Sequence, residues 1–73
     1  MPKACILIKT APHATERILE KVTKMSGVRK AFVAYGRWDI VAFVDASTEE
    51  TSKTSATINS IEGVRSTETL PQA

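Results

Sequence analysis

The sequence has few of the residues with which a small domain usually supplements its core. Its 73 residues include one cysteine, so no disulfide can form within the chain. They also include one histidine, which excludes a cluster of Cys and His ligands around a metal ion. A domain of this length buries only about 60% of the surface that its unfolded chain exposes. We therefore expect oligomerisation to complete the core.

Charge and hydropathy exclude several further classes of protein. Ten basic and eight acidic residues give a net charge of +2, too little for a strong nucleic-acid footprint. No uninterrupted apolar run approaches the roughly 20 residues that span a membrane, and the N-terminal residues lack the apolar region of a secretory signal. The sequence predicts one globular domain over residues 1–73, cytoplasmic, with no direct DNA binding and no membrane contact.

An internal repeat is the most informative feature of the sequence. When the chain is shifted along itself, residues 5–29 lie over residues 41–65 without a gap. Each copy has an apolar run, a polar stretch and then a Gly-Val-Arg step, at residues 27–29 and 63–65. Such a pattern indicates one supersecondary unit used twice.

The first unit is expected to fold as strand, helix and strand. Residues 4–8 suit a central strand, and Pro12 suits the first turn of the helix that follows. The apolar stripe of that helix comprises Ile18, Leu19, Val22 and Met25. Gly27 ends the helix, and residues 28–35 alternate as a strand does. The alternation places on one face Val28, Lys30, Phe32 and Ala34.

The second unit follows after a turn at residues 36–37, so the two middle strands are expected to form a hairpin. The third strand is predicted over residues 38–44. Ser47 and Glu50 form a capping box that opens a second helix. The few residues of that helix predicted to face the core are Thr51, Thr54, Ile58 and Ile61. The last strand is predicted over residues 64–70.

The resulting order is βαββαβ, which with right-handed crossovers predicts a ferredoxin-like α+β fold. This fold has a four-stranded antiparallel sheet with both helices on one face. The strands at residues 4–8 and 38–44 are apolar on both faces, so the face without helices needs a cover. We predict a homodimer packed sheet to sheet.

The residues needed for catalysis are missing. Cys5 lies within an apolar strand, where it is expected to be buried with its thiolate disfavoured. His13 is expected on the surface near a helix start, and neither histidine nor aspartate is spaced to activate a Ser or Thr. The sequence predicts no enzyme, no cofactor and no metal site.

One segment makes the sequence recognisable. Residues 35–41 read Tyr-Gly-Arg-Trp-Asp-Ile-Val at the predicted hairpin, and Gly-Val steps follow both helices. Together with Pro12 after the first strand and a Thr-rich last strand, this resembles the ligand-binding (RAM) domain of the Lrp/AsnC family. The resemblance covers essentially the whole chain. Two departures are notable: the chain looks like a stand-alone form without the family's helix-turn-helix, and His13 replaces a glycine in the first loop.

The resemblance implies a function. Domains of this family dimerise through their sheets, the dimers assemble into larger rings, and small amino-acid effectors bind between dimers beside the hairpin. It implies that the hairpin and last strand supply the effector-binding residues, namely Tyr35, Gly36, Arg37, Trp38, Asp39, Thr67 and Thr69. Gly36 would present amide groups to a carboxylate, and Asp39 would pair with an α-ammonium or hold the loop. A full-length Lrp/AsnC-type regulator is an expected partner.

Plainer interpretations stay open beside these roles. Gly36 can simply supply a positive φ, Asp39 can accept turn N–H bonds, and Trp38 can anchor a core or interface. An assembly or protein-interaction module without a physiological ligand would use the same surfaces. An ACT-like domain shares the element order and binds amino acids, but its dimers usually pack edge to edge, and the two-sided apolar strands favour face-to-face packing.

Overall fold

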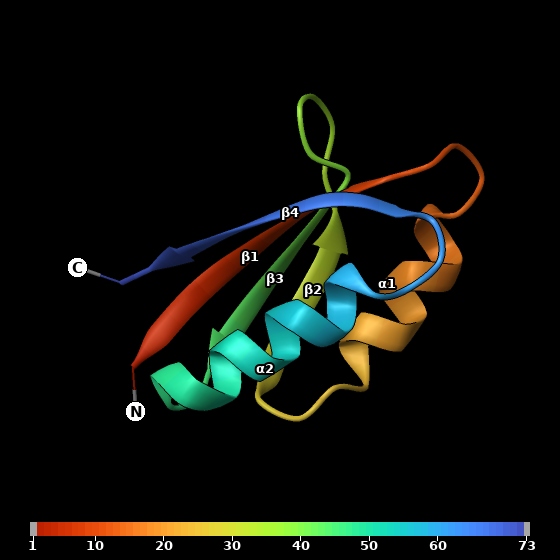
Figure 1. Cartoon of the computed structure of the whole chain (residues 1–73). Helices are drawn as coiled ribbons and strands as arrows, with labels where there is room; N and C mark the ends of the chain where they lie inside the picture. The colour runs from red at the N-terminus through yellow and green to blue at the C-terminus, as the bar shows by residue number, and fades with distance from the viewer. Residues whose placement is uncertain (1, 73) are drawn as a thin grey trace.

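The computed structural model describes residues 2–72 and has six regular elements (Figure 1). In chain order they are β1 (Lys3–Thr10), α1 (Thr15–Thr23), β2 (Val28–Val33), β3 (Ile40–Asp45), α2 (Thr48–Asn59) and β4 (Val64–Pro71). The strands are antiparallel and lie in the order β2-β3-β1-β4. Both helices cover the same face of the sheet (Figure 1). The predicted ferredoxin-like fold is therefore confirmed.

Alternate side chains of the two central strands form the core beneath the helices. Ile6 and Ile8 of β1 and Ile40 of β3 are fully buried there. The helix α1 contributes Ile18 and Val22, which are also fully buried. Burying a side chain of this size stabilises the fold by about 1.5–3 kcal/mol. These five side chains therefore fix α1 against the sheet.

The other face of the sheet carries no helix, and we call it the open face. Side chains alternate along a strand, so Cys5 and Leu7 of β1 point to this face, where both are half-buried. Phe43 of β3 is 41% exposed and Leu70 of β4 is 45% exposed. The ring of Phe32 lies 5.9 Å from that of Phe43. The open face is therefore largely apolar, and Cys5 is less buried than the sequence predicted.

The predicted alternation along β2 is wrong at its start. Between Val28 and Lys30 the strand advances two residues while β3 advances one, which is a β-bulge at Arg29. The extra residue reverses the faces, so Val28 and Ala31 pack against the core. Lys30 and Phe32 point to the other side of the sheet, the open face. Val28 therefore does not share a face with Lys30 and Phe32, as strict alternation predicted.

The helix α1 begins later than predicted, because a turn separates it from β1. The N–H of Ala14 donates to the carbonyl of Ala11 at 3.1 Å, which closes a β-turn with Pro12 and His13 at its centre. His13 has φ +68°, outside the helical region. Pro12 therefore lies in the turn before α1 and not in its first turn. His13 takes up the left-handed backbone that glycine would favour.

The start of α2 agrees with the sequence. Ser47 is the N-cap, and its hydroxyl accepts a hydrogen bond from the N–H of Glu50 at 3.1 Å. Thr51 and Ile58 are the buried residues of this helix. Ile61 packs against the core only in part and lies beyond the helix end.

Candidate functional site

The β2–β3 hairpin is longer than the two-residue turn that the sequence predicted. It consists of residues 34–39, and the N–H of Ala34 donates to the carbonyl of Asp39 at 2.8 Å across its base. Trp38 consequently lies in the loop, and β3 begins at Ile40. Figure 1 shows this loop, in light green, extending beyond the end of the sheet.

Asp39 fastens the hairpin to the end of β1. Its carboxylate Oδ2 accepts the N–H of Thr10 at 2.8 Å, and its own N–H donates to the carbonyl of Ile8 at 2.9 Å. Lys9 adds a third link, from its Nζ to the carbonyl of Arg37 at 3.3 Å. Hydrogen bonds to a charged acceptor are stronger than neutral ones. Of the two roles expected for Asp39, holding the loop is the one that its contacts show.

The outer part of the hairpin is open to solvent. Tyr35 is 98% exposed, and Gly36 and Arg37 are exposed beside it. Trp38 is half-buried. Gly36 has φ +119°, and a Cβ built on it would meet no atom within 4 Å. The backbone around Gly36 is therefore accessible to another molecule, while its left-handed conformation disfavours any other residue.

The two threonines of the last strand lie on the helix side of the sheet. Thr67 pairs with Ile8 and Thr69 pairs with Ile6, whose side chains are in the core. The hydroxyl of Thr69 donates to the hydroxyl of Ser55 on α2 at 3.1 Å. The structure thus brings the five hairpin residues together. Thr67 lies opposite Ile8, the β1 residue whose carbonyl accepts a hydrogen bond from the hairpin. Thr69 lies under α2.

Lys9 and Thr10 belong to the hairpin site but were not identified from the sequence. Their contacts with Arg37 and Asp39 join residues 28 and 29 positions apart in the chain. No local pattern encodes such contacts. The one available signal was the antiparallel pairing of β1 with β3, which brings the end of β1 beside the start of β3.

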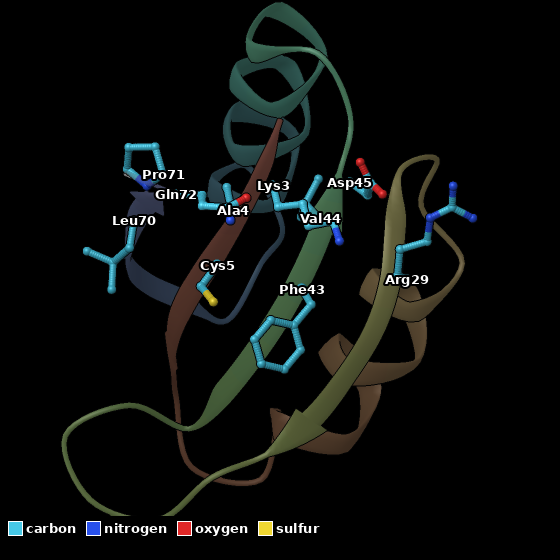
Figure 2. A pocket seen from close by; sticks show the side chains of 10 residues that line it. All are labelled: Lys3, Ala4, Cys5, Arg29, Phe43, Val44, Asp45, Leu70, Pro71 and Gln72. Atoms are coloured by element: carbon cyan, nitrogen blue, oxygen red, sulfur yellow. The ribbon is translucent and has the colours of Figure 1, made fainter. Parts of the chain in front are cut away.

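A second concave feature lies on the open face, at the end of the sheet away from the hairpin (Figure 2). It has a volume of about 540 Å³. Its lining includes apolar side chains from three strands, Cys5, Phe43 and Leu70. Charged residues at its edge are Lys3, Arg29 and Asp45. This hollow is not visible in the sequence, because its lining residues come from all four strands.

The histidine and the cysteine lie on different parts of the molecule. His13 is exposed in the loop after β1, and Cys5 is half-buried on the open face. Within residues 2–72, no group of three or more His, Cys, Asp or Glu side chains is placed to hold a metal ion. None of the helices in this part of the chain is long and apolar enough to cross a membrane.

Comparison with known proteins gives one match to a family and several to solved structures. The model of the Lrp/AsnC ligand binding domain matches residues 3–71 of this chain. This match covers both the hairpin and the open face. No curated protein sequence matches the chain significantly.

Solved structures with the same fold include two small proteins of similar length. TTHA0845 from Thermus thermophilus superposes with a TM-score of 0.95 at 29% identity, over 100% of this chain and 94% of that chain. The hypothetical protein PHS023 from Pyrococcus horikoshii gives a TM-score of 0.84 at 28% identity, over 100% and 90% of the two chains. Escherichia coli AsnC, at 22% identity and a TM-score of 0.82, shares the fold over 97% of this chain and 50% of its own.

Proposed function

Because the chain belongs to the Lrp/AsnC ligand-binding domain family, we propose that residues 1–73 act as one non-catalytic regulatory domain that binds a small amino-acid effector. The effector site is the hairpin, with contributions from a neighbouring subunit. The residues assigned to the site are Tyr35, Gly36, Arg37, Trp38, Asp39, Thr67 and Thr69. Within this set the hairpin residues meet the effector, while Thr67 and Thr69 support the strand beside it.

The anchored hairpin is the observation that carries this proposal. Asp39 and Lys9 hold the base of the loop on β1, so the outer loop keeps one shape at little entropic cost when a ligand binds. Accessible backbone at Gly36 offers N–H groups to an effector carboxylate. The exposed guanidinium of Arg37 supplies a further donor for the same carboxylate.

Assembly is the second part of the proposal. The open face carries the half-exposed side chains of Phe32, Phe43 and Leu70, and an apolar face of this kind favours burial against another protein. A second copy packed on this face forms a dimer. The hairpins extend beyond the sheet, where they reach neighbouring dimers in a larger assembly. A full-length regulator with the same kind of domain can join such an assembly.

A thermal-shift panel with the twenty amino acids at millimolar concentration tests effector binding. A ligand at about 100 times its dissociation constant adds roughly 2.7 kcal/mol of stability per site. Each kcal/mol raises the midpoint of a domain this small by about 4–8 °C. We expect a clear rise for one or a few amino acids. No rise with any of them would favour the alternative, an assembly module without a small-molecule ligand.

The variant Asp39→Ala links the binding to the hairpin. Removing the carboxylate leaves the N–H of Thr10 without its acceptor, so the loop loses its fixed shape and the effector-induced shift should disappear. The dimer should persist, because the open face is unchanged. Glu20→Ala is a matched control, since its contact with Lys24 is an exposed ion pair of little energy. A full effector response in Asp39→Ala would contradict the proposed site.

A further inference from the structure

The open face carries a charged side chain on each of its two edge strands. These edge strands are β2 and β4, with β3 and β1 between them (Figure 1). Residues that pair across neighbouring strands point to the same side of a sheet. Lys30 of β2 pairs with Phe43, and Glu68 of β4 pairs with Leu7, so both charged side chains belong to the open face. The face therefore has a basic residue at one edge, an acidic residue at the other and an apolar centre.

The two charges have no ionic partner within residues 2–72. Both side chains are exposed, and the ion pair of this part of the chain joins Lys24 to Glu20 on α1. Lys30 and Glu68 are three strand spacings apart, which is about 14 Å. They cannot reach each other along the sheet. Each is available to a group on another molecule.

A symmetric dimer on the open face can take two aligned orientations. Packed sheets keep their strands within about 30° of each other, and a two-fold axis brings the same surface of both copies together. The axis therefore runs either along the strands or across them. An axis along the strands places β2 over the partner's β4 and β3 over the partner's β1. An axis across the strands places every strand over its own counterpart.

The edge charges distinguish the two orientations. Lys30 is in line with Leu70 across the sheet, through Phe43 and Cys5, and Glu68 is two residues before Leu70. With the axis along the strands, Lys30 is thus offset from the partner's Glu68 by about 7 Å, and the sheets are about 10 Å apart. The flexible stem of lysine and the glutamate side chain can span this separation. With the axis across the strands, basic edge meets basic edge and acidic edge meets acidic edge, which is unfavourable.

The ends of β1 favour the same orientation. Lys3 and Lys9 alternate with Cys5 and Leu7, so they lie at the two ends of the open face. An axis across the middle of β1 would place Lys3 over the partner's Lys9. An axis along the strands instead places Lys3 over the partner's Asp45, because Lys3 and Asp45 occupy the same register position. Like charges are thus avoided at the ends as well as at the edges.

We propose that the open face is self-complementary in charge. A second copy binds with the two-fold axis along the strands, and Lys30 of each copy pairs with Glu68 of the other. Phe43 then lies over the partner's smaller Cys5, in the hollow of Figure 2. The proposal rests on the proposed function, which places a second copy on this face. It adds the orientation of that copy and the two residues that select it from other apolar surfaces.

Charge reversal at either position tests the pairing. In Lys30→Glu and in Glu68→Lys, both symmetric pairs of the dimer become like-charge contacts. The dissociation constant of the dimer, measured by sedimentation over a series of protein concentrations, should rise by about tenfold or more in each variant. Lys53→Glu, the same reversal on the exposed side of α2, should leave it unchanged. In the other orientation each reversal exchanges one like-charge contact for another, so unchanged constants in both variants would overturn the proposal.

A mixture of the two single variants tests whether the charges act as a pair. In a dimer of one Lys30→Glu chain and one Glu68→Lys chain, opposite charges face each other at both symmetric sites. The mixture should therefore form dimers within about threefold of the natural affinity. The double variant Lys30→Glu/Glu68→Lys should do the same on its own. If neither regained the dimer, the single variants would have failed for another reason and the pairing would be wrong.

The natural chain separates this proposal from the assembly on which it rests. Far-ultraviolet circular dichroism shows whether each variant is folded. A dimer that withstands both single reversals would contradict the charge pairing and leave assembly through the open face intact. A natural chain that sediments as a monomer at all concentrations would contradict the assembly itself, and the pairing with it.

Discussion

At the scale of single residues, His13 shows how one side chain decides where an element begins. It occupies the third position of a β-turn, with φ +68°. A proline at the second position and a positive φ at the third are the features of a type II turn, which normally has glycine at the third position. The turn delays α1 until Thr15. A non-glycine residue is tolerated here because the side chain of His13 is exposed.

Replacing His13 with glycine should stabilise the domain. A left-handed backbone costs an L-residue about 1–2 kcal/mol, while the extra freedom of glycine in the unfolded chain costs about 0.5–1 kcal/mol. The free energy of unfolding of His13→Gly should therefore rise by about 0.5–1 kcal/mol. Urea denaturation at one fixed protein concentration measures the change, because assembly makes stability depend on concentration.

His13→Ala is the matched control for this prediction. It removes the imidazole but keeps a Cβ in the left-handed conformation, so it should be no more stable than the natural chain. If His13→Ala were as stable as His13→Gly, the loss of the ring would explain the gain, and the backbone argument would be wrong.

At the scale of elements, α2 buries fewer apolar side chains against the sheet than α1 does. Ile58 is its one fully buried large side chain, and Thr51 is its other buried residue. A hydroxyl contact with β4, from Thr69 to Ser55, takes the place of apolar packing. Serine and threonine also have low intrinsic helix propensity. The end of the helix near Ser47 therefore depends on its cap.

Removing that cap should reduce stability measurably. In Ser47→Ala the N–H of Glu50 loses its acceptor, and the loss of such a cap costs about 0.5–2 kcal/mol. The thermal midpoint should fall by several degrees. Ser52→Ala on the exposed side of the same helix should not lower the midpoint, because alanine has the higher helix propensity. Equal losses in the two variants would contradict a specific role for the cap.

Local sequence signals are sufficient to predict the type and order of the elements. These signals are the hydrophobic periodicity, Gly27 after the first helix and the Ser47 cap of the second helix. The bulge at Arg29 could not be predicted, since either of two adjacent long polar side chains, Arg29 and Lys30, can face solvent. Pro12 does not by itself distinguish a helix start from a β-turn, because proline is common both in the first turns of helices and in β-turns. The choice between them depends on the φ of the residue that follows.

At the scale of the molecule, the sheet separates two regions with different chemistry. The hairpin motif was visible in the sequence because residues 35–41 are contiguous. Its anchor on Thr10 was not, because that contact exists only once β1 and β3 are paired. The hollow around Asp45 was hidden for the same reason. Thr67 and Thr69 lie two positions apart on β4 and so face the same side of the sheet, but the sequence alone does not say which side the helices cover.

The open face of the sheet is the surface on which we expect a second copy of the chain to pack. A stable interface covers about 800 Å² of each partner, against a total accessible surface of 4796 Å² for this chain. A charge buried in such an interface without a partner is strongly unfavourable. Phe43→Glu should therefore give a folded monomer, whereas Ala56→Glu, which adds the same charge on the exposed side of α2, should keep the assembly. Sedimentation measures the mass and far-ultraviolet circular dichroism the folding, and an unchanged mass for Phe43→Glu would show that the open face is not the interface.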